Sequence, residues 1–361
     1  MQDNALAKWV SPLMAFCLSF IIIATLAPMT GIQIDRQLDF WLLWLATMVL
    51  LALPICYLEV ALAKRSKQTA LQALSALTRD ADASPRWRIV GWLAVVFMPF
   101  LAGGMLANAS GLFNQYVLPD TNTQVIFAGL AVVALLLSLL PRLILIAITA
   151  VTVLLTIVLA NVFGVQLPEW QVTPVEFSEW GSATVLALVA SGLGLGVYSQ
   201  NSLTAVKQQD VATKTALPVW VAQLLAVIAF GFFAIQAQLP AVLLAIAVAA
   251  TAALLLQFAR EQLMERQIAL PIQWIILIVA IAVWAVAPLF AFFDTVLMVW
   301  GLVICLIYAI FAGWIMKISH LRKSLNFGSE AIYNIWRIAV RVISPLAIIL
   351  ALIAVLGRLF T

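Results

Sequence analysis

Polar side chains that could bind a solute or an ion are few in this chain, and they interrupt long apolar runs. They are Glu59, Asn108, Thr251 and a short segment with Ser191, Gly192, Gly194, Gly196 and Tyr198. Polar groups are costly inside hydrocarbon, so such exceptions carry information about function. A carboxylate, hydroxyls, an amide and freed backbone groups suit reversible binding of a small solute or a coupling ion. We therefore take these residues as the candidate site.

The residues needed for most enzyme chemistry are missing from these runs. His320 is the only histidine and lies in a basic loop, while Cys17, Cys56 and Cys305 lie in apolar runs. Three cysteines have neither the spacing of a metal site nor the even count of a disulfide framework, so we interpret them as apolar fillers. The sequence therefore does not favour an enzyme. No cofactor is expected, with sodium or a proton as the candidate coupling ions.

Three glycines at alternate positions, Gly192, Gly194 and Gly196, are poor for a continuous helix. Each costs about 1 kcal/mol relative to alanine in a helix interior. The pattern favours a discontinuous helix that exposes backbone groups to a solute. The alternative is close helix packing of the small-xxx-small kind. A dinucleotide loop is not indicated, because no strand–helix unit surrounds the glycines.

The other candidates each have two interpretations. Glu59 either pairs with Lys64 or Arg65 near the inner interface, or is buried and accepts hydrogen bonds from the broken helix. Asn108 is either a packing residue or a contact for solute. Thr251 bonds its own backbone or ligates an ion.

The elements that must position these residues are membrane helices. Hydrophobic residues make up 65% of the 361 residues and charged residues only 9%, which excludes a water-soluble domain. A crossing needs about 20 apolar residues. There are ten charge-free windows, of which the last, 342–357, is short but can be extended by 332–340. The window 215–259 must hold two crossings because Gln236, Gln238 and Pro240 lie near its middle. We predict an all-α polytopic membrane protein with 11 transmembrane helices and no soluble domain.

The basic residues predict the orientation. With the N-terminus in the cytoplasm and the C-terminus outside, 17 of the 19 Lys and Arg residues lie inside, as the positive-inside rule requires. This distribution also explains the basic character of the chain without a nucleic-acid partner. The expected location is the inner membrane, and the lipid bilayer is the expected environment.

Several of these motifs together resemble the neurotransmitter:sodium symporter family, which has the leucine-transporter-type fold. Pro54 and Glu59 resemble the Pro-x4-Glu end of that family's second helix, and Gly192–Gly196 resembles the stretch where its sixth helix unwinds. Thr251–Leu263 is similar to its eighth helix, and Trp336 to Pro345 to the start of its eleventh. The resemblance implies a single domain over 1–361. It has two inverted five-helix repeats, 9–163 and 180–316, and an extra helix over 332–357.

The departures from the family are concentrated in the ion-binding elements. The family's first helix is broken at a glycine-rich segment that supplies sodium ligands, whereas Phe20–Leu26 contains no glycine, asparagine or arginine. Ala102–Gly104 stand where the family places a substrate-binding tyrosine, and Thr251 alone remains of its hydroxyl run. We therefore expect an unbroken first helix and weak or no sodium dependence. Glu59 is the acid that could carry a proton instead.

Two functions from different classes follow. The first is a secondary transporter of a small amino-acid-like or amine-like solute that works by alternating access. Its solute would contact Asn108, Tyr198 and the backbone of Ser191–Gly196. The second is a degenerate transporter fold that serves as a non-transporting subunit, sensor or regulator, for which a membrane-protein partner is expected but not identified.

Overall fold

The computed structural model describes residues 2–28, 30, 37–163, 169–201, 212–233 and 239–358, and these residues are almost entirely helical. The first half contains α1 (Gln2–Leu26), α2 (Leu38–Thr47), α3 (Leu53–Ser66), α4 (Ala70–Asp80), α5 (Ile89–Tyr116), α6 (Thr123–Leu137) and α7 (Arg142–Phe163). The second half contains α8 (Phe177–Leu188), α9 (Val197–Asn201), α11 (Thr213–Phe233), α12 (Ala241–Glu265), α13 (Leu270–Ala282), α14 (Phe290–Ile310), α15 (Ile318–Leu325), α16 (Glu330–Ile338) and α17 (Ser344–Gly357).

Short π and 3-10 turns lie between or beside several of these helices. One π turn (Met48–Ala52) joins α2 to α3, another (Ala339–Ile343) joins α16 to α17, and a third (Phe311–Ile315) ends α14. The 3-10 turns are Pro85–Arg88, Val283–Ala285 and Ala287–Leu289. Within the described ranges, the only strand-like pairing is a single parallel bridge between Gln37 and Gln171.

The helices confirm a multi-pass membrane protein. In the described part of the chain, eight helical segments are long and apolar enough to cross a bilayer, and two shorter apolar segments are Thr123–Leu137 and Leu270–Ala285. The long window 215–259 does contain two helices, α11 and α12; the expected turn residues Gln236 and Gln238 lie outside the described residues.

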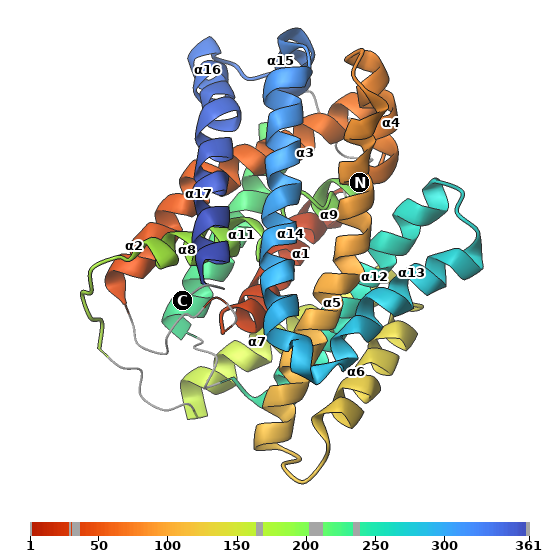
Figure 1. The fold of residues 1–361 in the computed structure, drawn as a ribbon, viewed down its shortest axis with the longest axis vertical. Coiled ribbons are helices and arrows are strands. Elements are labelled where there is room, and N and C mark those ends of the chain that lie inside the picture. The colour runs from red at the N-terminus through yellow and green to blue at the C-terminus, as the bar shows by residue number, and fades with distance from the viewer. Residues whose placement is uncertain are drawn as a thin grey trace.

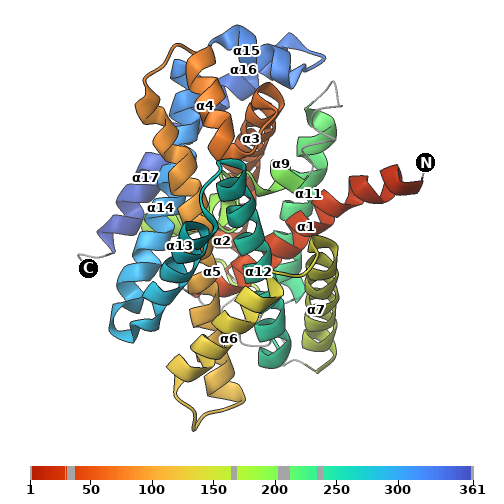
Figure 2. The same ribbon diagram turned by 90° about the vertical axis from the view of Figure 1, so that its right-hand side faces the viewer.

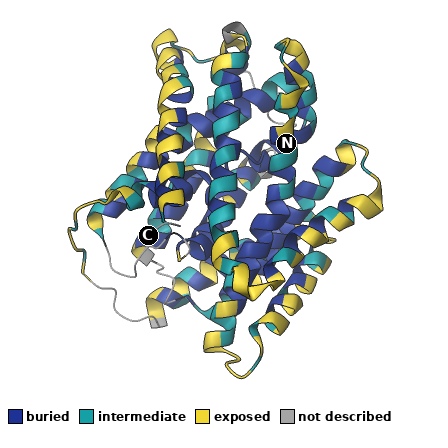
Figure 3. Cartoon of the chain, viewed as in Figure 1, coloured by how far each residue is buried: buried dark blue, intermediate teal, exposed yellow. Residues whose placement is uncertain are grey.

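Helices α1, α5 and α12 contact one another in the core, and α9 contacts both α1 and α12. Helix α12 packs against α5 and α7, α1 against α11, and α17 against α8. Buried residues fill the middle of the molecule, whereas the outer faces of α6, α13 and α17 are exposed (Figure 3). These exposed faces are apolar: Leu136 is 61% exposed and Ile353 54%. Apolar side chains on the outside of a bundle are what contact with lipid tails requires.

Different helices and links lie at the two ends of the molecule. Helices α4 and α15 lie at one end, and the link between α5 and α6 lies at the other (Figure 1). Figure 2 shows the same separation from the side. Helix α4 is amphipathic and turns Leu71, Leu74 and Leu77 toward the bundle. It therefore covers the end of the core nearest to Glu59.

Candidate functional site

A helix interrupted in the middle of the core is the feature around which the site is built. Helix α8 ends at Leu188 and α9 begins at Val197. Between them Gly192, Gly194 and Gly196 have φ angles of 65°, 81° and 75°. A residue with a Cβ pays about 1–2 kcal/mol for this left-handed conformation, whereas glycine adopts it freely. The predicted break is confirmed, and the alternate spacing of the glycines follows from the backbone path.

The carbonyl groups freed by the break are bonded to side chains of this chain. The Ser191 carbonyl accepts a hydrogen bond from the Tyr198 hydroxyl at 2.6 Å and another from Gln223 Nε2 at 3.0 Å. Gln262 Nε2 donates to the Leu195 carbonyl at 3.3 Å. Buried backbone groups must find such partners, so α9, α11 and α12 hold the unwound segment in place.

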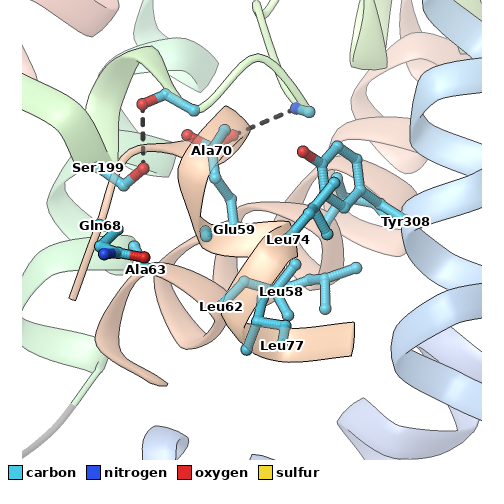
Figure 4. A pocket seen from close by; sticks show the side chains of 14 residues that line it. Leu58, Glu59, Leu62, Ala63, Gln68, Ala70, Leu74, Leu77, Ser199 and Tyr308 are labelled. Atoms are coloured by element: carbon cyan, nitrogen blue, oxygen red, sulfur yellow. Dashed lines mark hydrogen bonds between the residues drawn. The ribbon is translucent and has the colours of Figure 1, made fainter. Parts of the chain in front are cut away.

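Glu59 on α3 forms a hydrogen bond with the same unwound segment. Its Oε2 accepts a hydrogen bond from the Gly194 amide at 3.2 Å (Figure 4). The amide and hydroxyl of Ser199 also lie close enough to interact with the carboxylate. Arg65 instead pairs with Asp80 at 2.8 Å. The prediction that Glu59 is bonded to the broken helix is therefore confirmed, and the pairing with Arg65 is not found.

Helix α1 runs unbroken through Phe20–Leu26, as predicted. The Thr25 hydroxyl donates to the carbonyls of Ile21 and Ile22, both at 3.0 Å, so it is bonded within its own helix. Asn108 Nδ2 on α5 donates to the Thr25 carbonyl at 3.0 Å. Asn108 thus links α5 to the end of α1, and its amide group already has a partner inside the protein.

Thr251 differs from the other candidates because its hydroxyl has no hydrogen-bond partner among the described residues. The residue is fully buried on α12. An unpaired buried hydroxyl costs free energy, which leaves this oxygen available to a ligand. The described residues contain no group of three or more His, Cys, Asp or Glu side chains placed to hold a metal ion.

The small residues on α5 serve packing. A Cβ added at Gly103 would lie 2.5 Å from Cδ1 of Trp284, and one added at Gly104 would lie 2.9 Å from Cδ1 of Leu297. Trp284 is fully buried against them. The indole therefore occupies the space beside the positions where the resembling family places its tyrosine.

A polar network at the C-terminal end of α12 was not predicted from the sequence. Gln200 Nε2 donates to Glu261 at 2.7 Å, Glu261 pairs with Arg142, and Gln262 Oε1 accepts from the Leu71 amide at 3.0 Å. These contacts join α4, α7, α9 and α12. On α12, Glu265 follows Glu261 by four residues and Gln262 by three, so it can share a helix face with each of them, and this spacing was the signal available in the sequence.

No protein-family model matches the chain, and no curated protein sequence matches it either. Among solved structures, the chain is similar to the crystal structure of MhsT in complex with L-phenylalanine. The TM-score is 0.56 at 16% sequence identity, and the match covers 96% of this chain and 98% of that one. MhsT is a neurotransmitter:sodium symporter, so the chain has the leucine-transporter-type fold that its motifs indicated.

Proposed function

We propose that the protein is a secondary transporter of a small amino-acid-like or amine-like solute that works by alternating access. The observation that carries this proposal is the buried break between α8 and α9, at the packing centre of a transporter fold. Discontinuous membrane helices commonly form the substrate sites of such folds.

The number of residues that stabilise the interrupted helix supports a role of this segment in solute binding. A continuous helix would satisfy its own backbone in lipid, whereas this segment requires three left-handed glycines and donors from Tyr198, Gln223 and Gln262. A bound solute would form hydrogen bonds with the backbone of the break in place of these internal hydrogen bonds. Ser191, Gly192, Gly194 and Gly196 would offer backbone groups, and Asn108 and Tyr198 would offer side chains.

We propose further that transport depends weakly or not at all on sodium. Sodium takes about five or six oxygen ligands, and hard cations prefer oxygen. The carbonyls of Ile23 and Leu26 accept backbone hydrogen bonds, and that of Thr25 accepts one from Asn108. The Thr25 hydroxyl is bonded within its own helix. Thr251 contributes a single hydroxyl. These groups are too few for a full coordination shell.

The proposed arrangement in the membrane has eleven crossings. The eight long segments, the two shorter ones and the interrupted pair α8–α9 make up this number. Residues 9–163 and 180–316 would form the inverted repeats, with 332–357 as the additional helix. The N-terminus would lie in the cytoplasm and the C-terminus outside, in the inner membrane of the cell.

A second function, that of a non-transporting subunit, sensor or regulator, is favoured by one specific observation. The Ser191 and Leu195 carbonyls already accept hydrogen bonds from within the chain, and α1 has no break of its own. A fold locked in this way could bind a membrane-protein partner without moving a solute.

Radiolabelled uptake into proteoliposomes across a panel of amino acids and small amines distinguishes the two functions. Transport predicts uptake of at least one solute, reduced in Gly194→Ala and retained in Gly111→Ala. In Gly194→Ala the new Cβ lies 3.0 Å from Cγ2 of Ile304 in a left-handed conformation, whereas at Gly111 it meets nothing within 4 Å. Absence of uptake for the whole panel by a folded protein would favour the second function.

A further inference from the structure

A small cavity lies beside Glu59, between the broken helix and the amphipathic helix α4. Its volume is about 30 Å³, and α3, α4, α14 and the unwound segment line it. A cavity needs roughly 10–15 Å³ to hold a water molecule. There is room for water here, but not for an amino-acid-sized solute.

Two residues that line this cavity contribute buried oxygen atoms that have no hydrogen-bond partner among the described residues. They are Oε1 of Glu59 and the hydroxyl of Tyr308, which is 6% exposed. In Figure 4 Tyr308 lies on one side of Glu59, and Gln68 and Ser199 lie on the other. Unpaired polar atoms of this kind are costly unless water, a proton or another ligand satisfies them.

The described residues that line the cavity give the carboxylate no ionic partner. No Lys, Arg, Asp or second Glu is among its described lining residues, and α4 contributes only apolar ones. The titratable groups that interact with Glu59 are Cys56 on α3, Tyr198 on α9, and Cys305 and Tyr308 on α14. All four are neutral in their ordinary protonated forms.

We propose that Glu59 is a proton-binding site of this protein, and that a water molecule held between Glu59 Oε1 and the Tyr308 hydroxyl delivers the proton. A hydronium ion gives its proton to Oε1, an O–H bond forms on the carboxyl, and water remains. The new O–H donates to the cavity water, which in turn bonds to the Tyr308 hydroxyl. Tyr308 is a positioning residue in this step.

Protonation of Glu59 weakens its hydrogen bond to the broken helix. The hydrogen bond from the Gly194 amide to Oε2 is charge-assisted when Glu59 is ionised and neutral when it is protonated. Charge-assisted hydrogen bonds are about twice as strong as neutral ones. Proton binding therefore loosens the tie between α3 and the unwound segment. If the protein transports as proposed above, this makes the proton the coupling ion.

Infrared difference spectroscopy of the purified protein in nanodiscs, titrated with pH, tests the site without any transport. We expect a carbonyl-stretch band of a protonated carboxyl that disappears in Glu59→Gln and moves in frequency and titration midpoint in Tyr308→Phe. Exposed Glu169→Gln and Tyr116→Phe serve as controls and should leave the band unchanged. A band that persists in Glu59→Gln, or one that Tyr308→Phe does not move, overturns the proposal.

Uptake driven by a pH gradient tests the coupling separately. We expect a solute found in the panel to accumulate under an inward proton gradient, and accumulation to be lost in Glu59→Gln and retained in Glu169→Gln. Gradient-driven accumulation that survives in Glu59→Gln refutes the coupling. If no solute is taken up but the infrared band behaves as expected, the proton site stands and the proposed transport function fails.

Discussion

Gly196→Ala should destabilise the folded protein strongly, because this position combines a left-handed backbone with a close neighbour. Gly196 has φ of +75°, and an added Cβ would lie 2.7 Å from the Cβ of Ala70, the first residue of α4. The Ala70 side chain has no flexible end that could move away. Either α4 or the unwound segment must shift.

The expected magnitude follows from these two contributions. A left-handed alanine costs about 1–2 kcal/mol. Forcing an extra carbon into a packed site costs about 1–3 kcal/mol. The free energy of unfolding should therefore fall by about 2–5 kcal/mol.

Equilibrium unfolding in mixed detergent micelles, followed by the fluorescence of the 13 tryptophans, measures this change. Gly111→Ala is the matched control, because it lies inside α5 with nothing within 4 Å of the new Cβ. Helix propensity predicts that Gly111→Ala raises the free energy of unfolding by up to about 1 kcal/mol. If Gly196→Ala unfolds at the same detergent fraction as Gly111→Ala, the conformation described for the break is wrong.

Three further changes test other parts of the structure. Glu59→Ala should lower the free energy of unfolding by about 1–3 kcal/mol, because the buried Gly194 amide loses its acceptor; an unchanged unfolding curve would mean that Glu59 is merely solvated. Gln262→Ala should lower the free energy of unfolding by at least as much, since it removes the partners of both the Leu71 amide and the Leu195 carbonyl. A smaller decrease than in Glu59→Ala would argue against the polar network. Cysteines placed at Asp120 and Arg322 should label from outside and from the cytoplasm respectively, and labelling of Asp120 only from the cytoplasm would refute the orientation.

The sequence predicted the helix break and the unbroken first helix because both depend on local backbone preference. Gly192–Gly196 disfavour a helix at any location, and Phe20–Leu26 contain no residue that would interrupt one. The position of Glu59 was also predictable, since a carboxylate in a membrane helix needs donors and the broken helix is the nearest source of free amides.

The partners of the side chains could not be predicted, because they depend on how distant helices pack. Asn108 was interpreted as either a packing residue or a contact for solute, and it bonds the Thr25 carbonyl, 83 residues away in the chain. Tyr198 turns back onto the Ser191 carbonyl of its own loop. Tyr308 reaches the cavity beside Glu59 from a helix with no polar pattern to mark it.

The sodium dependence of uptake tests the central claim most directly, namely that the broken α8–α9 helix serves a transporter without a sodium site. The initial rate for the best solute of the panel is measured in proteoliposomes at fixed pH and zero membrane potential, with sodium replaced by N-methylglucamine. We predict that the rate is unchanged when sodium is removed. A rate that rises steeply with sodium concentration would contradict the account.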